Sequence, residues 1–177
     1  MKKFLNFIWE VVKIVVVAAA IVVPIRYFLF QPFVVRGQSM EPNFENRDYL
    51  IIDQLSLRLR EPQRGEVVVF KYPQAPSQKY IKRIVGLPGD TVEIKDGKVA
   101  VAGSELKEYY LPENVFTDEK GFKKITLGEN EYFVLGDNRA VSSDSRVWGV
   151  LPEENIIGRV FVRAWPFTVF AKEALEY

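Results

Sequence analysis

Apolar residues follow two different patterns in this chain, one on each side of residue 35. The first run, residues 4–30, is apolar at nearly every position and is interrupted only at Asn6, Glu10, Lys13, Pro24 and Arg26. Its uncharged centre, residues 14–25, is shorter than the roughly 20 residues that a membrane-spanning helix needs. Lys13 and Arg26 lie at the two ends of that centre, where long side chains can reach the lipid headgroups. The pattern therefore predicts a transmembrane helix that Pro24 kinks or ends.

Two other interpretations of the apolar run stay open at this point. A cleaved export signal would use Lys2 and Lys3 as its charged leader, although the alanines at 18–20 lie inside the apolar run instead of after it. A buried helix of a soluble protein would need a polar face, which the run lacks. Trp9 and Tyr27 lie where interfacial aromatic residues are expected. We expect a retained anchor with its amino end in the cytoplasm and the remaining chain outside.

Beyond residue 35 the apolar runs are short and are bounded by Asp, Gly and Pro, which is typical of buried strands. The predicted strands are residues 49–52, 66–70, 131–135 and 156–163, with a bulge at Gly158. Alternating residues 91–95 and 98–101 flank Asp96-Gly97, which predicts a hairpin with a type I′ turn. Short helices are expected only at residues 56–60 and 172–177.

These elements predict a mainly β fold with an antiparallel β-rich domain behind one helix. We expect residues 1–31 to form a cytoplasmic tip and membrane anchor, and residues 32–177 to form the folded domain. The stretch from about 103 to 130 is rich in Glu, Lys and Tyr and is interpreted as an insertion between two halves of the core.

The composition narrows the possible chemistry. The 177 residues suit one domain with a short appendage, and the formal net charge of +1 comes without a basic stripe that would indicate nucleic acid. The chain has no cysteine and no histidine, so it has neither a disulfide framework nor the usual soft metal ligands. We expect no metal, no cofactor and no nucleic-acid partner. Without imidazole, lysine is the best remaining base for activating a serine.

Ser39 and Lys82 are the candidates for such a pair. Ser39 follows Gly37, whose missing side chain lets another backbone approach closely. In a strand, Lys82 shares one face with Tyr80 and Ile84. A lysine with its ordinary pKa near 10.4 is a poor base at pH 7, but apolar neighbours lower that pKa by disfavouring the charged form. Read separately, the serine fits a solvated position and the lysine fits an edge strand that resists aggregation.

A polar loop at residues 136–146 supplies the third group of candidates. Asp144 and Arg146 have the types and spacing for a bidentate ion pair that would stiffen this loop. The hydroxyl of Ser142 is placed to orient a neutral lysine amine. In isolation, however, the segment is also an ordinary turn exposed to solvent.

Four segments in this order resemble the bacterial type I signal peptidases, in the small form with a single anchor. They are GQSMEP at 37–42, RGEVVVF at 64–70, YIKRIVGLPGD at 80–90 and GDNRAVSSDSRVWG at 136–149. One Gly-x-Ser-Met is a weak signal, whereas four ordered segments behind an apolar helix are specific. The resemblance implies a membrane-bound serine protease that removes signal peptides from exported preproteins, cutting after small-x-small (Ala-x-Ala) sites at the outer face of the cytoplasmic membrane.

The resemblance also implies residue roles. Ser39 would be the nucleophile, Lys82 the general base, and Ser142 the residue that orients the lysine. A supporting polar network would comprise Arg83, Asp137, Asp144 and Arg146. The substrate-binding positions around the shallow pockets would be Phe33, Val35, Met40, Tyr80 and Ile81. An extended substrate is expected to add alongside the strands that lead to Ser39 and Lys82.

Three positions depart from the family pattern. Gly37 lacks the hydroxyl that some members use in the oxyanion hole, which leaves the Ser39 N–H and an unidentified second donor. Ala140-Val141 replaces a pair that is often polar, and Asn43 stands where threonine is usual. Two alternatives therefore remain: an anchored β domain that binds peptides without cutting them, and a serine–lysine autoprotease related to the SOS-response repressors.

Overall fold

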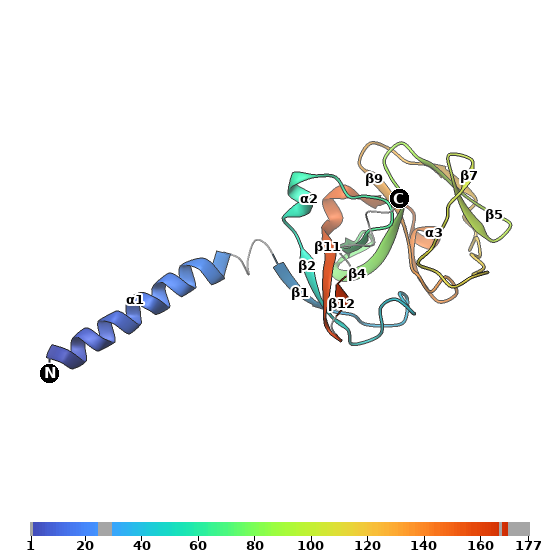
Figure 1. Ribbon diagram of the computed structural model, residues 1–177. Coiled ribbons are helices and arrows are strands. Elements are labelled where there is room, and N and C mark those ends of the chain that lie inside the picture. Colours follow the sequence, from blue (N-terminus) through green and yellow to red (C-terminus); the bar gives the residue numbers. More distant parts are fainter. Residues whose placement is uncertain (1, 25–29, 167, 170–177) are drawn as a thin grey trace.

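A long apolar helix and a β-rich domain make up the computed structural model, which describes residues 2–24, 30–166 and 168–169 (Figure 1). Helix α1 spans Lys2–Pro24, about 35 Å at 1.5 Å per residue. Its apolar part, Asn6–Val23, is long enough to cross a bilayer and is wholly exposed. A core helix would be buried, so this helix fits a single-pass membrane anchor instead. Arg26, Tyr27 and the helix expected at 172–177 lie outside the described residues.

Lys13 within α1 is paired, which lowers the cost of placing its charge in an apolar surrounding. Its Nζ donates a hydrogen bond of 2.6 Å to Oε1 of Glu10, one turn earlier. Intramembrane charges are usually tolerated when they have such a partner. The helix can therefore carry these two charges close to its midpoint.

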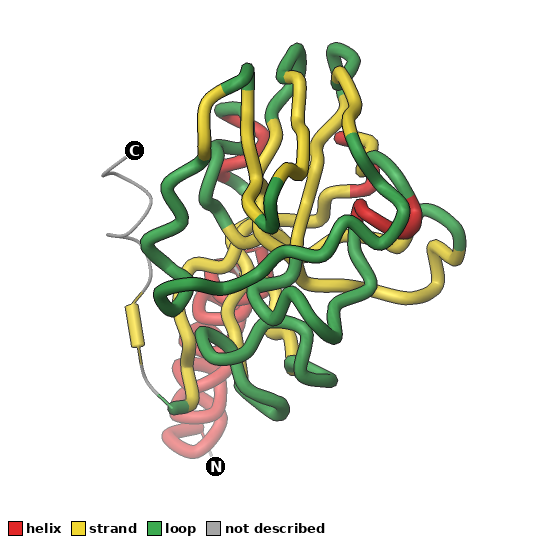
Figure 2. Tube along the Cα trace, turned by 90° about the vertical axis from the view of Figure 1, so that its right-hand side faces the viewer, coloured by secondary structure: helices red, strands yellow, loops and turns green. Residues whose placement is uncertain are grey.

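The predicted antiparallel architecture is confirmed, and strands and loops dominate the domain (Figure 2). The larger sheet has the order β1-β2-β11-β3-β4-β9-β10, and β12 pairs with β11. Its strands are β1 (Phe30–Val34), β2 (Tyr49–Asp53), β3 (Val67–Tyr72), β4 (Ala75–Gly86), β9 (Glu131–Leu135), β10 (Leu151–Pro152), β11 (Ile156–Trp165) and β12 (Thr168–Val169). The predicted bulge is present, since the register of β11 against β3 shifts at Gly158.

A second sheet has the order β7-β6-β5-β8. Its strands are β5 (Thr91–Lys95), β6 (Lys98–Val101), β7 (Ser104–Glu105) and β8 (Lys124–Thr126). The type I′ turn between β5 and β6 is confirmed by positive φ at both Asp96 (52°) and Gly97 (79°). Residues 103–130 thus add two short strands to a hairpin that the sequence already specifies.

Helical segments of the domain are short. They are α2 (Ser56–Leu59), α3 (Ser145–Trp148) and a 3-10 helix (Glu153–Asn155). The helix at Ser56 was predicted, whereas α3 begins inside the segment that we expected to be entirely loop. It forms because the Asp144 side chain accepts the N–H of Arg146 and so caps the first turn.

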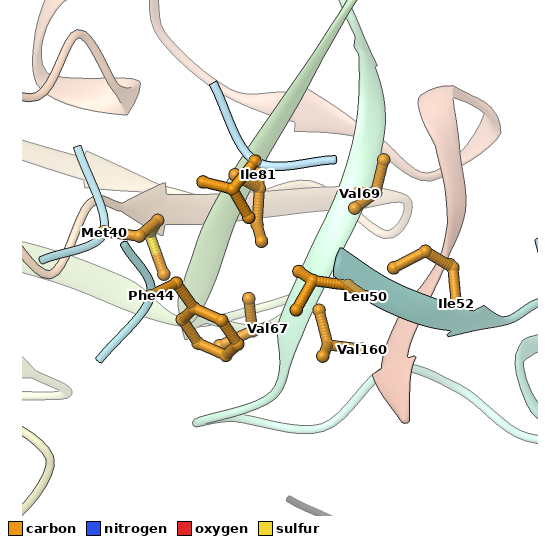
Figure 3. Close-up of a cluster of buried hydrophobic side chains, with 9 residues drawn as sticks. Met40, Phe44, Leu50, Ile52, Val67, Val69, Ile81 and Val160 are labelled. Carbon is orange, nitrogen blue, oxygen red and sulfur yellow. The ribbon is translucent and has the colours of Figure 1, made fainter. Parts of the chain in front are cut away.

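The core that matters for the site is built from side chains of β2, β3, β4 and β11 and of the segment that follows β1 (Figure 3). Met40 and Phe44, which follow Ser39 in the chain, are 1 % exposed and pack in one cluster with Val67 and Ile81. Burying side chains of this size contributes about 1.5–3 kcal/mol each. The segment after Ser39 is therefore held firmly against the strand that carries Lys82.

Candidate active site

Ser39 and Lys82 are in direct contact in the folded domain. Lys82 Nζ lies 2.7 Å from Ser39 Oγ, and it also donates a hydrogen bond of 2.9 Å to the carbonyl of Ile81. Lys82 is 3 % exposed, although its strand is solvent-exposed at residues 76–79. The two side chains that the sequence singled out are thus in hydrogen-bond contact, in a place with little access to water.

The surroundings of Lys82 favour its neutral form. Burial lowers its pKa from 10.5 to about 8, and the nearby carboxylates of Asp144 and Asp137 oppose this only partly. The Tyr80 ring lies 5.5 Å from Nζ and adds an aromatic wall. A charged amine donates to the serine oxygen, whereas a neutral amine accepts the serine proton. With a pKa of about 8, a substantial fraction of Lys82 is in the neutral, proton-accepting form near neutral pH.

The loop at 136–146, here called the catalytic loop, holds the backbone of Ser39. The N–H of Asn138 donates to the Ser39 carbonyl at 3.1 Å. Gly136 packs so closely that a Cβ there would collide with both the Ser39 carbonyl and the Ser142 side chain. A glycine is required at this position because two segments far apart in the sequence touch across it.

Two buried ion pairs stiffen the loop. Arg83 donates to both Asp137 oxygens, at 2.9 and 2.7 Å, and Arg146 donates to both Asp144 oxygens, at 2.8 and 2.7 Å. The expected bidentate pair between Asp144 and Arg146 is present. Burial alone would raise the pKa of Asp144, but the hydrogen bonds and charge of Arg146 lower it overall. All four side chains contact each other or the backbone, and none of them contacts Ser39 Oγ among the described hydrogen bonds.

Ser142, the residue expected to orient the lysine, lies on the catalytic loop. It is fully buried beside Gly136, and within the described residues its Oγ has no partner in good hydrogen-bond geometry. The hydroxyl acts on the Asp144 carboxylate, whose pKa it helps to lower. The amine of Lys82 instead bonds Ser39 Oγ and the Ile81 carbonyl. In this structure the amine thus bonds a main-chain oxygen of its own strand, and the orienting role of Ser142 stays a prediction.

The carbonyls at the Ala140-Val141 turn have a partner that the sequence did not suggest. Lys120 Nζ donates to the Ala140 carbonyl at 3.2 Å and to the Ser142 carbonyl at 2.7 Å. A lysine from residues 103–130 thus bonds a turn that lacks the usual polar side chains. Gly37 lies at φ 92°, and its N–H donates to Asn46 Oδ1. This N–H therefore already has a hydrogen-bond partner.

A cleft of about 900 Å³ opens beside the two candidate residues. Its lining includes Pro32, Phe33, Val34, Arg36, Gly37, Gln38, Ser39, Ser77, Gln78, Lys79, Tyr80, Ile81, Lys82, Val141 and Ser143. Because β1 and β4 both border it although three strands separate them in the sheet order, the sheet must curl around the cleft.

Three of the five expected substrate-binding residues line this cleft, and two do not. Phe33, Tyr80 and Ile81 border it, whereas Val35 (2 % exposed) and Met40 (1 % exposed) are buried in the core. Val35 and Met40 lie behind the wall of the cleft, and their role in substrate binding stays a prediction.

The cleft also contains residues that sequence reasoning missed. Arg36, Lys79 and Gln78 are exposed polar side chains with no motif to mark them. Their only sequence signal is their closeness to Ser39 and Lys82 along two extended segments. In the described part of the chain, no group of three or more acidic, histidine or cysteine side chains is arranged to hold a metal ion.

Comparisons with known proteins show which family this chain resembles. The family model for signal peptidase, peptidase S26, matches residues 8–165. The chain is 41 % identical over 162 residues to a probable signal peptidase I-2 of Synechocystis sp., covering 89 % of this chain and 73 % of the relative. It is 34 % identical over 168 residues to a signal peptidase I of Bacillus amyloliquefaciens, covering 90 % and 89 %. A crystal structure of a signal peptidase I from Enterococcus faecalis V583 is 35 % identical, covers 56 % of this chain and 97 % of its own, and superposes with a TM-score of 0.48.

Proposed function

The chain belongs to the signal peptidase S26 family, and from that premise we propose that Ser39 and Lys82 form the catalytic dyad with which it cuts preproteins after small-x-small sites. Membership of the family makes the protein a protease that removes signal peptides. The assignment of the dyad and the rule for the cleavage site go beyond what family membership establishes. The observation that supports them is the 2.7 Å contact between a serine hydroxyl and a lysine amine whose pKa is lowered to about 8.

The proposed reaction uses one proton carrier in two half-reactions. Ser39 Oγ attacks the scissile carbonyl carbon while its proton passes to the neutral Lys82 amine. The protonated amine then gives that proton to the departing nitrogen, so the mature protein leaves with a free amino terminus and an acyl-serine remains. In the second half, Lys82 takes a proton from water, the water oxygen attacks the ester, and the signal peptide leaves with a new carboxylate as Ser39 regains its proton.

The open edges of two strands provide the place for an extended substrate. In the described residues, β1 pairs only with β2, and the part of β4 before Arg83 pairs only with β3. A peptide lying between these edges would add a strand and would bring its scissile bond to the ends where Ser39 and Lys82 meet. Because Val35 and Met40 fill the space behind the cleft wall, only small substrate side chains are expected to fit next to the serine.

The exposed apolar helix supports the proposed location. With α1 in the cytoplasmic membrane and its amino end in the cytoplasm, the β domain would work at the outer face, where exported chains emerge. The proposed partners are therefore the signal peptides of preproteins and the lipid bilayer itself, with no metal or nucleic acid.

A preprotein series tests the cleavage rule. In detergent, the full-length protein is expected to cut a preprotein after Ala-x-Ala, and changing the alanine before the bond to leucine is expected to lower kcat/KM by at least about 100-fold. A leucine side chain is too large for the packed wall and would move the scissile bond away from Ser39. A displacement of about 1 Å can lower the reaction rate by about 100-fold. Mass spectrometry of the products checks the cut site. Equal cleavage of the leucine and alanine substrates would contradict the rule.

The pH dependence tests the role of Lys82. Only the neutral amine accepts the serine proton, and its fraction increases as pH rises through the pKa of about 8. We expect kcat/KM to climb through this range with an apparent pKa near 8 and then to level off. Steady-state assays between about pH 6 and pH 10 measure this limb. A midpoint near the ordinary lysine value of 10.5 would mean that the amine is solvated in the working enzyme.

A further inference from the structure

The insertion segment, residues 103–130, contacts the catalytic loop through a nearly buried carboxylate. Arg139 Nη1 donates to Glu108 Oε2 at 2.9 Å, and Arg139 Nη2 donates to the other Glu108 oxygen. The Arg139 side chain is 1 % exposed and the Glu108 side chain 12 %. A bidentate pair fixes both the position and the plane of the guanidinium, and removing one partner from a buried pair leaves an uncompensated charge.

Arg139 transmits this restraint to the segment around the nucleophile. Its Nε donates to the Gly136 carbonyl at 3.1 Å, and its Nη1 also donates to Thr117 Oγ1 at 2.6 Å. Gly136 packs against the Ser39 carbonyl, and the neighbouring Asn138 N–H bonds that same carbonyl. Glu108 is therefore separated from the backbone of Ser39 by one arginine and one turn of the catalytic loop.

A second branch leads from the same carboxylate to the strand that carries the base. The Tyr110 hydroxyl donates to Glu108, and the Tyr110 ring lies 4.0 Å from the guanidinium carbon of Arg83, which follows Lys82 on β4. The Tyr110 carbonyl accepts a bond of 2.8 Å from Asn43 Nδ2, which also donates to Asp137 Oδ2 at 2.8 Å. The residue that departs from the family pattern at position 43 thus connects the insertion segment with the Arg83–Asp137 pair.

We propose that Glu108 is a positioning residue for the reaction: by holding Arg139 and Tyr110, it keeps the backbone of Ser39 and the strand of Lys82 in the relative position that proton transfer requires. The carboxylate touches neither the substrate nor the reacting atoms. Its effect comes from connecting the insertion segment to both members of the dyad at once. This inference rests on the proposed dyad, and it gives the insertion segment a role in catalysis.

The insertion segment offers a matched control for Glu108. Glu105 lies three positions earlier, on β7, and its carboxylate pairs with Lys98 at 2.6 Å with both side chains more than half exposed. Glu105→Gln removes the same charge from the same segment without touching the catalytic loop. Because exposed pairs of this kind contribute little, kcat is expected to stay within about twofold of the wild-type value.

The test compares Glu108→Gln, Glu108→Asp and Glu105→Gln with the wild-type full-length enzyme in detergent. For Glu108→Gln we expect kcat to fall by about 100-fold with KM nearly unchanged, because misplacing reacting groups by about 1 Å has an effect of this size and leaves ground-state binding intact. Glu108→Asp keeps the charge and should recover part of the loss. Thermal unfolding, followed in parallel, establishes that each variant is folded at the assay temperature.

The pH profile separates positioning from a general loss of stability. The charged groups around Lys82 are the carboxylates of Asp144 and Asp137 on the catalytic loop, and its aromatic neighbour is Tyr80. If the loop loosens and admits water, the burial penalty on Lys82 decreases and the midpoint of the rate profile moves above about 8, toward 10.5. A defect that merely reduces the folded fraction would lower the amplitude of the profile and leave its midpoint unchanged.

The outcomes are distinct. A folded Glu108→Gln enzyme with wild-type kcat and midpoint overturns the inference, and so does a variant that loses stability alone. If Glu108→Gln does not fold, Glu108→Asp decides: reduced kcat with a shifted midpoint supports positioning, and wild-type values overturn it. A wild-type protein that cleaves no preprotein would overturn the proposed dyad itself, whereas an active wild type with an unaffected Glu108→Gln variant would overturn only the role of Glu108.

Discussion

The Lys82→Met variant is expected to lose proteolysis and to become more stable at neutral pH. Methionine has a comparable length and no ionisable group, so Ser39 loses its proton acceptor. In serine proteases, removing the nucleophile or the base lowers kcat by roughly 10⁶-fold, and we expect a loss approaching that size here. Single-turnover cleavage of a preprotein at saturating enzyme measures this loss separately from substrate binding.

The stability gain follows from the pKa of Lys82. The amine is charged up to about pH 10.5 in the unfolded chain but only up to about pH 8 in the folded protein, which costs the folded state about 3 kcal/mol at pH 7. Methionine escapes this penalty but gives up the hydrogen bonds to Ser39 and the Ile81 carbonyl. We expect the free energy of unfolding to increase by about 1–3 kcal/mol at pH 7.

The pH dependence of that gain has a definite sign. The penalty on the wild type is complete below pH 8, shrinks as the pH rises from 8 to 10.5 and vanishes above that value. The stability difference between variant and wild type should accordingly narrow between pH 7 and pH 10. Denaturant unfolding at both pH values measures it, with Lys95→Met on the exposed face of β5 as the control. A variant less stable than the wild type at pH 7 would contradict the view that Lys82 is costly to bury.

For Ser39→Ala, the expected result is loss of the covalent step with the fold and the cleft intact. The hydroxyl is half-buried, so its removal should change stability by less than about 1 kcal/mol, while kcat falls by roughly 10⁶-fold. Intact-mass spectrometry after treatment with an acylating inhibitor should find one adduct on the wild type and none on the variant. Ser104→Ala on the short strand β7 is the matched control and should be labelled like the wild type.

The same pair of proteins distinguishes the alternative functions. A domain that binds peptides without cutting them would bind a preprotein equally well with or without the Ser39 hydroxyl and would never form an adduct. An autoprotease would cut its own chain and leave an added preprotein intact. Preprotein cleavage by the wild type together with retained preprotein binding by Ser39→Ala is the outcome that supports the proposed dyad.

Local sequence predicted those parts of the fold that local interactions determine. The hairpin at Asp96-Gly97 and the bulge at Gly158 were both predicted. The turn has positive φ at both of its residues, and at Gly158 a Cβ would collide with the Asp53 carbonyl. Strands β7 and β8 have two and three residues and no pattern of their own, so they could not be predicted. They form because the edges of the hairpin were available for pairing.

The residues of the candidate site were also predicted only in part. Ser39 and Lys82 were identifiable because a chain without histidine has few other ways to activate a serine. The burial of Val35 was not predicted, since it depends on how the chain turns after β1. Glu108 had no motif at all, and its importance appears only when Arg139 is found buried against it.

By itself, the sequence determined the apolar helix at the amino terminus, the strand-rich domain and the pair of residue types able to do the chemistry. Each of these depends on residues that are close together in the chain or on the absence of a residue type. The tertiary structure decided that the amine and the hydroxyl, 43 positions apart, lie 2.7 Å from each other and that the amine is almost dry. The pKa of a lysine is set by the water and charges around it, and those come from segments that only folding brings together.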